Sequence, residues 1–206
     1  MKKILSFVFV SFFVSSLFAG DLQSICAALA KTPNTLGNFT QIKTISSNGR
    51  QLKSSGDFII STEGIMWNTV KPFPSKLVVT EKSMIQVAAN GKKNVMNGSD
   101  NQIFKNISQT LRSVFAGNSD DLEKNFSVTF TEKPDGLWTV LLQPKDSTIA
   151  SVMQTLELSG SDKNNQVTLL SLELQETSNN KIRYEFSNHK YPKELTADEK
   201  ENFFVN

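Results

Sequence analysis

From residue 39 onward, apolar residues alternate with polar ones in short runs. The clearest alternating apolar positions are Phe126, Val128, Phe130, Leu170, Leu172 and Leu174. Because successive side chains of a strand point to opposite faces, a period of two predicts strands with one apolar and one solvated face.

Turn residues separate these runs at short, regular intervals, which predicts consecutive hairpins in an antiparallel sheet. The turn signals include Asn48-Gly49, Glu63-Gly64, Pro72-Phe73-Pro74, Asn90-Gly91 and Asn97-Gly98. The predicted strands are 38–46, 50–62, 64–70, 75–81, 83–89, 93–96, 125–132, 136–143, 153–160, 166–177 and 180–188.

Helical spacing of apolar residues occurs in a few places. It predicts a first helix over 21–31, and a strongly apolar helix over 101–117 that ends at Gly117. Shorter helices are expected near 146–152 and 196–202. About eleven half-apolar strands should curl around these helices. We therefore expect a mainly β (α+β) fold, with one curled antiparallel sheet forming an incomplete β-barrel closed by a few short helices.

The N-terminus has the pattern of a secretory signal peptide. Lys2 and Lys3 precede an apolar stretch over 4–18, which is short for a membrane span of roughly 20 residues. Cleavage is expected after Ala19 or Gly20, so that residues 1–19 are the signal peptide and residues 20–206 form one domain. An uncleaved anchor is the less favoured alternative, and the expected location is the periplasm.

Charge and cysteine content limit the functional classes further. The formal net charge is +2, and it falls to about zero without Lys2 and Lys3, with the remaining charges interspersed. A nucleic-acid partner is therefore not expected. The single cysteine, Cys26, excludes an intramolecular disulfide and is expected to be a small buried residue.

Residue sets for catalysis or metal binding are missing from the sequence. His189 is the only histidine, and no Gly-x-Ser-x-Gly motif accompanies it. We interpret it as a surface or strand-end residue. One His and one Cys cannot make a zinc site, and Asp120-Asp121 with Glu123 is better interpreted as the cap of a short turn. We predict no enzymatic activity, no metal and no cofactor.

Apolar and aromatic residues are abundant instead, with fifteen phenylalanines and two tryptophans in the chain. Most such residues fill cores. The functional alternative is that some line a pocket for acyl chains, where each buried methylene contributes about 0.8 kcal/mol.

The order of motifs over residues 37–81 resembles the outer-membrane lipoprotein carrier family, LolA. The residues that carry the resemblance are Gly37-Asn38-Phe39-Thr40-Gln41, Leu52-Lys53-Ser54-Ser55-Gly56-Asp57-Phe58, Gly64-Ile65-Met66-Trp67 and Pro72-Phe73. The second motif, and the third together with the fourth, are similar to a LolA-like branch of the family rather than to its best-known members. The order of elements is also similar across most of the chain after residue 20.

The resemblance implies a periplasmic carrier, or chaperone, that shields acyl chains of lipoproteins in an apolar cavity and shuttles them from the inner to the outer membrane. It implies an inner-membrane ABC-type release complex as donor and an outer-membrane acceptor. We expect a monomer. The best-known carriers have a lid-binding arginine shortly before the Trp, whereas this chain has Ser61-Thr62-Glu63 there. A glycolipid or another lipid, or a lipoprotein-sensing role, therefore remains an alternative.

We predict that the cavity is lined by apolar positions of the strands between residues 56 and 79 and of the helix over 101–117, and that this helix acts as a lid. The predicted lipid-binding residues are Phe58, Ile60, Ile65, Trp67, Leu77, Val79, Ile103, Ile107 and Leu111. The assignment depends on strand parity, because a slip of one residue would turn the opposite side chains inward.

Overall fold

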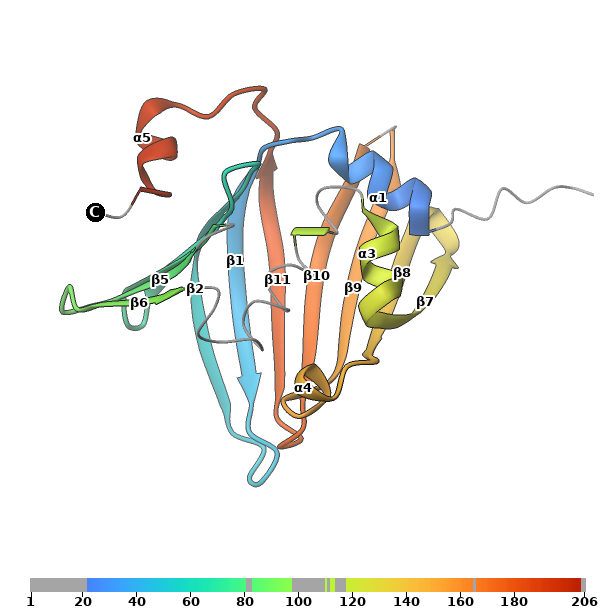
Figure 1. Ribbon diagram of the computed structural model, residues 1–206, viewed down its shortest axis with the longest axis horizontal. Helices are drawn as coiled ribbons and strands as arrows, with labels where there is room; N and C mark the ends of the chain where they lie inside the picture. The colour runs from blue at the N-terminus through green and yellow to red at the C-terminus, as the bar shows by residue number, and fades with distance from the viewer. Residues whose placement is uncertain are drawn as a thin grey trace, which may run out of the picture.

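The main element of the protein is a single antiparallel sheet of eleven strands in the order β6-β5-β4-β3-β2-β1-β11-β10-β9-β8-β7 (Figure 1). The computed structural model describes residues 22–80, 83–97, 110, 112–113, 118–164 and 166–204. The strands are β1 (Thr35–Thr44), β2 (Gln51–Ile60), β3 (Ile65–Lys71), β4 (Ser75–Val79), β5 (Ser83–Ala88), β6 (Lys93–Asn97), β7 (Phe126–Lys133), β8 (Leu137–Pro144), β9 (Met153–Lys163), β10 (Gln166–Glu176) and β11 (Lys181–Lys190).

The sheet consists of two wings joined at its centre. Strands β1 to β6 form the first wing and β7 to β11 the second, and within each wing every strand pairs with its neighbour in sequence. The wings meet where β1 pairs with β11, from Leu36 opposite Lys190 to Thr44 opposite Lys181. The outer strands β6 and β7 do not pair with each other. The predicted mainly β fold with an incomplete barrel is therefore confirmed.

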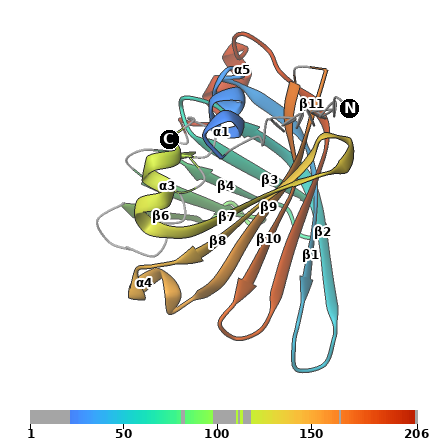
Figure 2. The ribbon, with the colours of Figure 1, turned by 90° about the vertical axis from the view of Figure 1, so that its right-hand side faces the viewer.

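Short helices lie on both sides of this sheet. They are α1 (Leu22–Ala30), α3 (Ser119–Asn125), α4 (Ser147–Ala150) and α5 (Ala197–Glu201). Figure 2 shows α1 and α3 on the concave side. The sequence predicted the helices at α1, α4 and α5. At α3 it predicted only a capped turn, but the structure has a helix there, which the buried Leu122 anchors. The predicted helix over 101–117 lies largely outside the described residues.

Helix α1 covers part of the concave face with one apolar side. Its buried residues Leu22, Ile25, Cys26 and Leu29 follow helical spacing and join the larger core with side chains such as Trp138. The expectation that Cys26 is buried is confirmed, and burial raises the pKa of its thiol to about 11. This thiol therefore stays protonated near neutral pH. None of the helices in the described part of the chain is long and apolar enough to span a membrane.

The first wing also has a core on its outer, convex face. Ile59, Met66, Val78 and Ile85 point outward from β2 to β5 and are buried. The C-terminal segment covers them with Leu195 and Phe203, on either side of α5. Helix α5 begins with a capping box, in which Thr196 and Glu199 each accept a hydrogen bond from the other's backbone N–H group. The convex face of this wing is therefore covered by the C-terminal segment.

Phe203 and Phe204 give a matched test of this outer core. Phe203 is 3 % exposed and Phe204 is 64 % exposed. We expect Phe203→Ala to lower the free energy of unfolding by about 3 kcal/mol or more, as is usual for buried Phe→Ala changes. Phe204→Ala should change it by less than about 0.5 kcal/mol. Urea unfolding of the two variants measures both values, and equal values would contradict the assignment.

Candidate functional site

A cavity of about 310 Å³ lies between the two wings. The first wing contributes residues of β1, β3, β4 and β5, and the second wing contributes residues of β9, β10 and β11. The lining residues are Phe39, Gln41, Ile65, Trp67, Thr69, Ser75, Leu77, Val79, Gln86, Met153, Leu156, Leu172, Leu174, Ile182 and Tyr184. Because its walls come from both wings, the cavity depends on the pairing of β1 with β11.

Aromatic side chains connect the wings inside this cavity. The ring centroid of Tyr184 on β11 lies 5.9 Å from that of Phe39 on β1 and 6.1 Å from that of Trp67 on β3. Burial raises the pKa of the Tyr184 hydroxyl to about 12, so this group is uncharged at physiological pH. The indole Nε1 of Trp67 is buried and has no hydrogen-bond acceptor among the described residues.

The lining of the first wing changes from apolar to polar along the strands. On β3, Ile65 and Trp67 are followed by Thr69, which pairs with Ser75 next to the β3–β4 turn. Gln86 on β5 lies opposite Leu77. On β1, Phe39 is followed by Gln41, which accepts a hydrogen bond from the Ser54 hydroxyl at 3.3 Å. The cavity therefore has an apolar interior and polar groups toward the β3–β4 turn.

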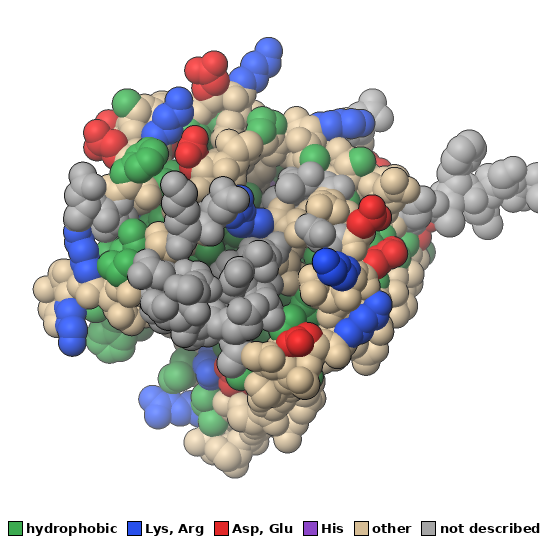
Figure 3. All heavy atoms as spheres, in the orientation of Figure 1, with side chains coloured by type: hydrophobic (Ala, Val, Ile, Leu, Met, Phe, Trp, Pro, Cys, Tyr) green, Lys and Arg blue, Asp and Glu red, His purple; other side chains and the backbone are tan. Residues whose placement is uncertain are grey.

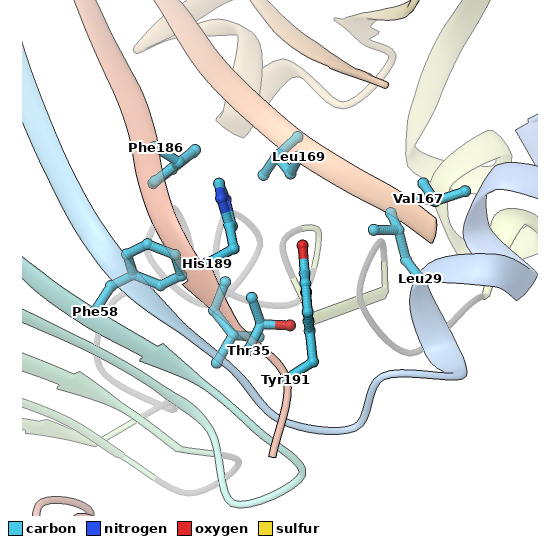
Figure 4. Close-up of a pocket in the computed structure, with 9 residues that line it drawn as sticks. Leu29, Thr35, Phe58, Val167, Leu169, Phe186, His189 and Tyr191 are labelled. Atoms are coloured by element: carbon cyan, nitrogen blue, oxygen red, sulfur yellow. The ribbon is translucent and has the colours of Figure 1, made fainter. Parts of the chain in front are cut away.

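The opposite end of the concave face is closed by packed side chains (Figure 4). The remaining gap there is about 10 Å³, about the volume needed for one water molecule. The gap is lined by Leu29, Thr35, Phe58, Ile60, Val167, Leu169, Phe186, His189 and Tyr191. Phe58 and Phe186 pack edge to face with ring centroids 5.1 Å apart. This end has no room for a ligand.

A β-bulge in the β1–β11 pairing accounts for the position of His189. Between Leu36 and Asn38 the register shifts, so that Gly37 faces two residues of β11. Asn188 adopts a left-handed conformation with φ 53°. A Cβ atom at Gly37 would lie 2.7 Å from the Ser187 carbonyl oxygen, so this position requires glycine. His189, expected as a surface or strand-end residue, lies at the strand end but is half-buried.

The structure distributes the predicted lipid-binding residues over two places. Four of them, Ile65, Trp67, Leu77 and Val79, lie on the lining of the 310 Å³ cavity. Phe58 and Ile60 lie at the closed end instead. Ile103, Ile107 and Leu111 lie outside the described residues, as does most of the predicted lid. The lipid-binding role of all nine residues stays a prediction.

The second wing contributes cavity residues that the sequence pattern did not predict, and it contains one irregularity. Leu172 and Leu174 line the cavity, in line with their shared apolar face. Leu170, however, was expected on the same face and is 38 % exposed, because a bulge between Leu169 and Ser171 inverts the alternation. Leu172, which follows the bulge, continues the apolar lining on the concave face. The alternation of apolar and polar residues predicts that Leu172 and Leu174 share a face, but it does not reveal the bulge before them.

Groups that could catalyse a reaction or hold a metal do not gather at this cavity. Within the described residues, no three or more His, Cys, Asp or Glu side chains are placed to bind a metal ion. The polar lining consists of amide and hydroxyl groups, with the partly buried Tyr184 and the Trp67 indole. The arrangement can enclose apolar chains and form a few hydrogen bonds.

The fold and the cavity define a class of protein, namely an incomplete β-barrel with an internal, mainly apolar cavity. Residues 31–199 match the family described as outer membrane lipoprotein carrier protein LolA. The chain therefore belongs to the LolA family. Comparison with curated proteins gives no match.

The chain also has similarity to several solved structures. A LolA superfamily protein from Nitrosomonas europaea is 10 % identical, with a TM-score of 0.45 over 86 % of this chain and 96 % of that one. A DUF1329 family protein from Desulfovibrio piger is 9 % identical, with a TM-score of 0.46 over 85 % of this chain and 92 % of that one. A domain from Vibrio parahaemolyticus, described as outer membrane lipoprotein-sorting, is 8 % identical, with a TM-score of 0.41 over 86 % of this chain and 96 % of that one.

His189 should make the stability of the fold depend on pH. Burial lowers its pKa, and a hydrogen bond with the Leu169 backbone only partly offsets this effect. The Nε2 atom is buried without a partner among the described residues. Since the unfolded chain then binds more protons, stability is complete above the unfolded pKa of about 6.5 and falls as pH drops below it.

We expect His189→Gln to reduce this loss. The free energy of unfolding, measured in urea at neutral pH and at about pH 5, should fall less in the variant than in the wild type. An equal fall in both proteins would assign the pH dependence to other groups.

Proposed function

We propose that this protein is a periplasmic carrier that shields the acyl chains of lipoproteins in the cavity and shuttles them from the inner to the outer membrane. The observation that carries the proposal is the cavity of about 310 Å³, whose interior is lined by apolar side chains from both wings. Membership of the LolA family supports the same conclusion. An acylated protein can cross an aqueous compartment only if its chains are kept from water.

The polarity of the lining suggests an orientation for the cargo. Acyl chains would occupy the apolar interior near Phe39, Ile65 and Leu156, where they replace no hydrogen bonds. The more polar glyceryl and peptide end would lie near Thr69 and Ser75, beside the β3–β4 turn. In this orientation the protein part of the cargo remains outside the barrel.

The further parts of the proposal come from the family. The donor would be an inner-membrane ABC-type release complex and the recipient an outer-membrane acceptor. The signal peptide over residues 1–19 would bring residues 20–206 to the periplasm, where the protein would act as a monomer and without catalysis. The predicted lid over 101–117 would open and close over the cavity.

Native mass spectrometry of the processed protein, purified from the periplasm of its own host, tests this proposal. Lipid extraction from the same sample identifies the cargo. Co-purification with a diacylglyceryl lipoprotein supports the proposal. Co-purification with a glycolipid would instead identify the protein as a carrier of that lipid class. If repeated detergent-free preparations contain no lipid, a sensor is favoured over a carrier.

Filling the cavity should weaken acyl-chain binding without unfolding the protein. We expect Ser75→Trp to reduce the affinity for a fluorescent diacyl lipopeptide on the order of 100-fold, if the indole displaces about four methylenes at about 0.8 kcal/mol each. Leu77→Glu should reduce it further, because a carboxylate would lie against the apolar lining. Fluorescence titration measures the affinity.

Thr129→Glu is the matched control, since Thr129 is exposed on β7. This variant should bind the lipopeptide like the wild type. Circular dichroism verifies that all three variants are folded. If Ser75→Trp and Leu77→Glu, while folded, bind as tightly as the control, the 310 Å³ cavity is not the acyl site.

A further inference from the structure

Two turns of the first wing form an exposed tip beside the polar end of the cavity. Because Ser75 at the start of β4 pairs with both Thr69 on β3 and Ala88 on β5, the β3–β4 and β5–β6 turns lie next to each other. We call this surface the wing tip and define it by Val70, Lys71, Phe73, Lys92, Lys93 and Val95. Figure 1 shows the β5–β6 hairpin projecting from the body of the sheet.

Apolar side chains at the wing tip are unusually exposed. Phe73 is 79 % exposed, Val95 is 55 % exposed and Val70 is 48 % exposed. Phe73 lies between Pro72 and Pro74, which restrict the backbone of this turn. A large aromatic side chain held in water by a restricted turn is an expected feature of a surface that contacts an apolar phase.

The charge of the wing tip has one sign. No Asp or Glu occurs from Asn68 to Val79 or from Ser83 to Asn97, and these segments carry four lysines: Lys71, Lys76, Lys92 and Lys93. Lys71, Lys92 and Lys93 are exposed and form no ion pair with any other described residue. Figure 3 shows lysine or arginine and hydrophobic side chains close together at the left-hand edge of the molecule.

Acidic groups elsewhere do not neutralise this surface. The acidic helix α5 packs with Leu195 and Phe203 on the convex face, and Asn202 at its end accepts a hydrogen bond from Lys76 at 2.8 Å. Among the described residues, no carboxylate of α5 forms an ion pair with Lys71, Lys92 or Lys93. Lys43 pairs with Glu176 at 2.9 Å, at the turn end of the second wing. Glu173 accepts from Lys181 and Arg183. The carboxylates of Glu173 and Glu176 are therefore paired with basic residues of β11 and β1.

We propose that the wing tip docks the protein onto an anionic phospholipid surface, with Phe73 and Val70 entering the interface and Lys71, Lys92 and Lys93 facing lipid phosphates. Aromatic and lysine side chains combined on one surface are suited to the headgroup region. A specific protein interface buries about 800 Å² per partner, and two short turns offer little of that area. The observations therefore favour a membrane over an acidic protein.

Docking in this way would bring the polar end of the cavity to the membrane. Thr69 and Ser75 line the cavity and form the last pair of β3 and β4 before the turn that carries Phe73. Cargo could then pass between bilayer and cavity over a short distance. This inference goes beyond the carrier proposal, because docking is measured on protein without cargo and can fail while acyl-chain binding persists.

Vesicle co-sedimentation of the processed protein tests the proposal. We expect binding to phosphatidylcholine vesicles that contain phosphatidylglycerol, little binding to phosphatidylcholine alone, and weaker binding as salt screens the charges. Replacement of Lys71, Lys92 and Lys93 together by Gln should weaken binding by about fivefold per lysine. Phe73→Ser should weaken it roughly tenfold and Phe73→Trp should preserve it.

Matched variants control for net charge and exposed aromatic area. Replacing the exposed Lys31, Lys133 and Lys163 by Gln removes the same charge elsewhere, and Phe204→Ser removes another exposed ring. The proposal is overturned if these control variants lose as much vesicle binding as the wing-tip variants. It is also overturned if the wild type binds vesicles equally well with and without phosphatidylglycerol. It is also overturned if the Lys71, Lys92 and Lys93 variant binds vesicles normally but passes cargo poorly, which would assign the wing tip to an acidic protein partner.

Discussion

The pairing of β1 with β11 is the interaction on which the rest of the structure depends. Each wing can form by local hairpins, but the β1–β11 pairing joins residues from opposite ends of the described chain, such as Thr44 and Lys181. Closing so long a loop costs conformational entropy that local hairpins do not. The cavity exists only when this pairing has formed, because its walls come from both wings.

The β-bulge within the β1–β11 pairing helps to close one end of the barrel. The bulge at Asn188 places an extra residue opposite Gly37, and the half-buried His189 then lines the closed end with Phe58 and Phe186. Farther along the same two strands the pairing is regular, and Phe39 and Tyr184 line the open cavity. One pair of strands therefore closes the barrel at one end and leaves space at the other.

Local patterns were sufficient to predict the strands but not the site. Glycine and asparagine turns such as Asn48-Gly49 mark hairpins in any context, so all eleven strands could be placed. Which side chains line the cavity depends on how far along the barrel each strand reaches. Phe58 points to the concave side as predicted, yet packs at the closed end, and the bulge before Ser171 turns Leu170 outward. Tyr184 and Leu156 were missed because their partners across the barrel are distant in sequence.

The outer core explains how the first wing can keep unfilled space on its concave face. A cavity forgoes the packing contacts that other side chains would supply, which lowers stability. The same strands that line the cavity through Ile65 and Leu77 bury Met66 and Val78 on the convex face, beneath Leu195 and Phe203. Because side chains alternate along a strand, one face can supply stability while the other stays free for a ligand. The C-terminal segment thus stabilises the wing from outside, without occupying the cavity.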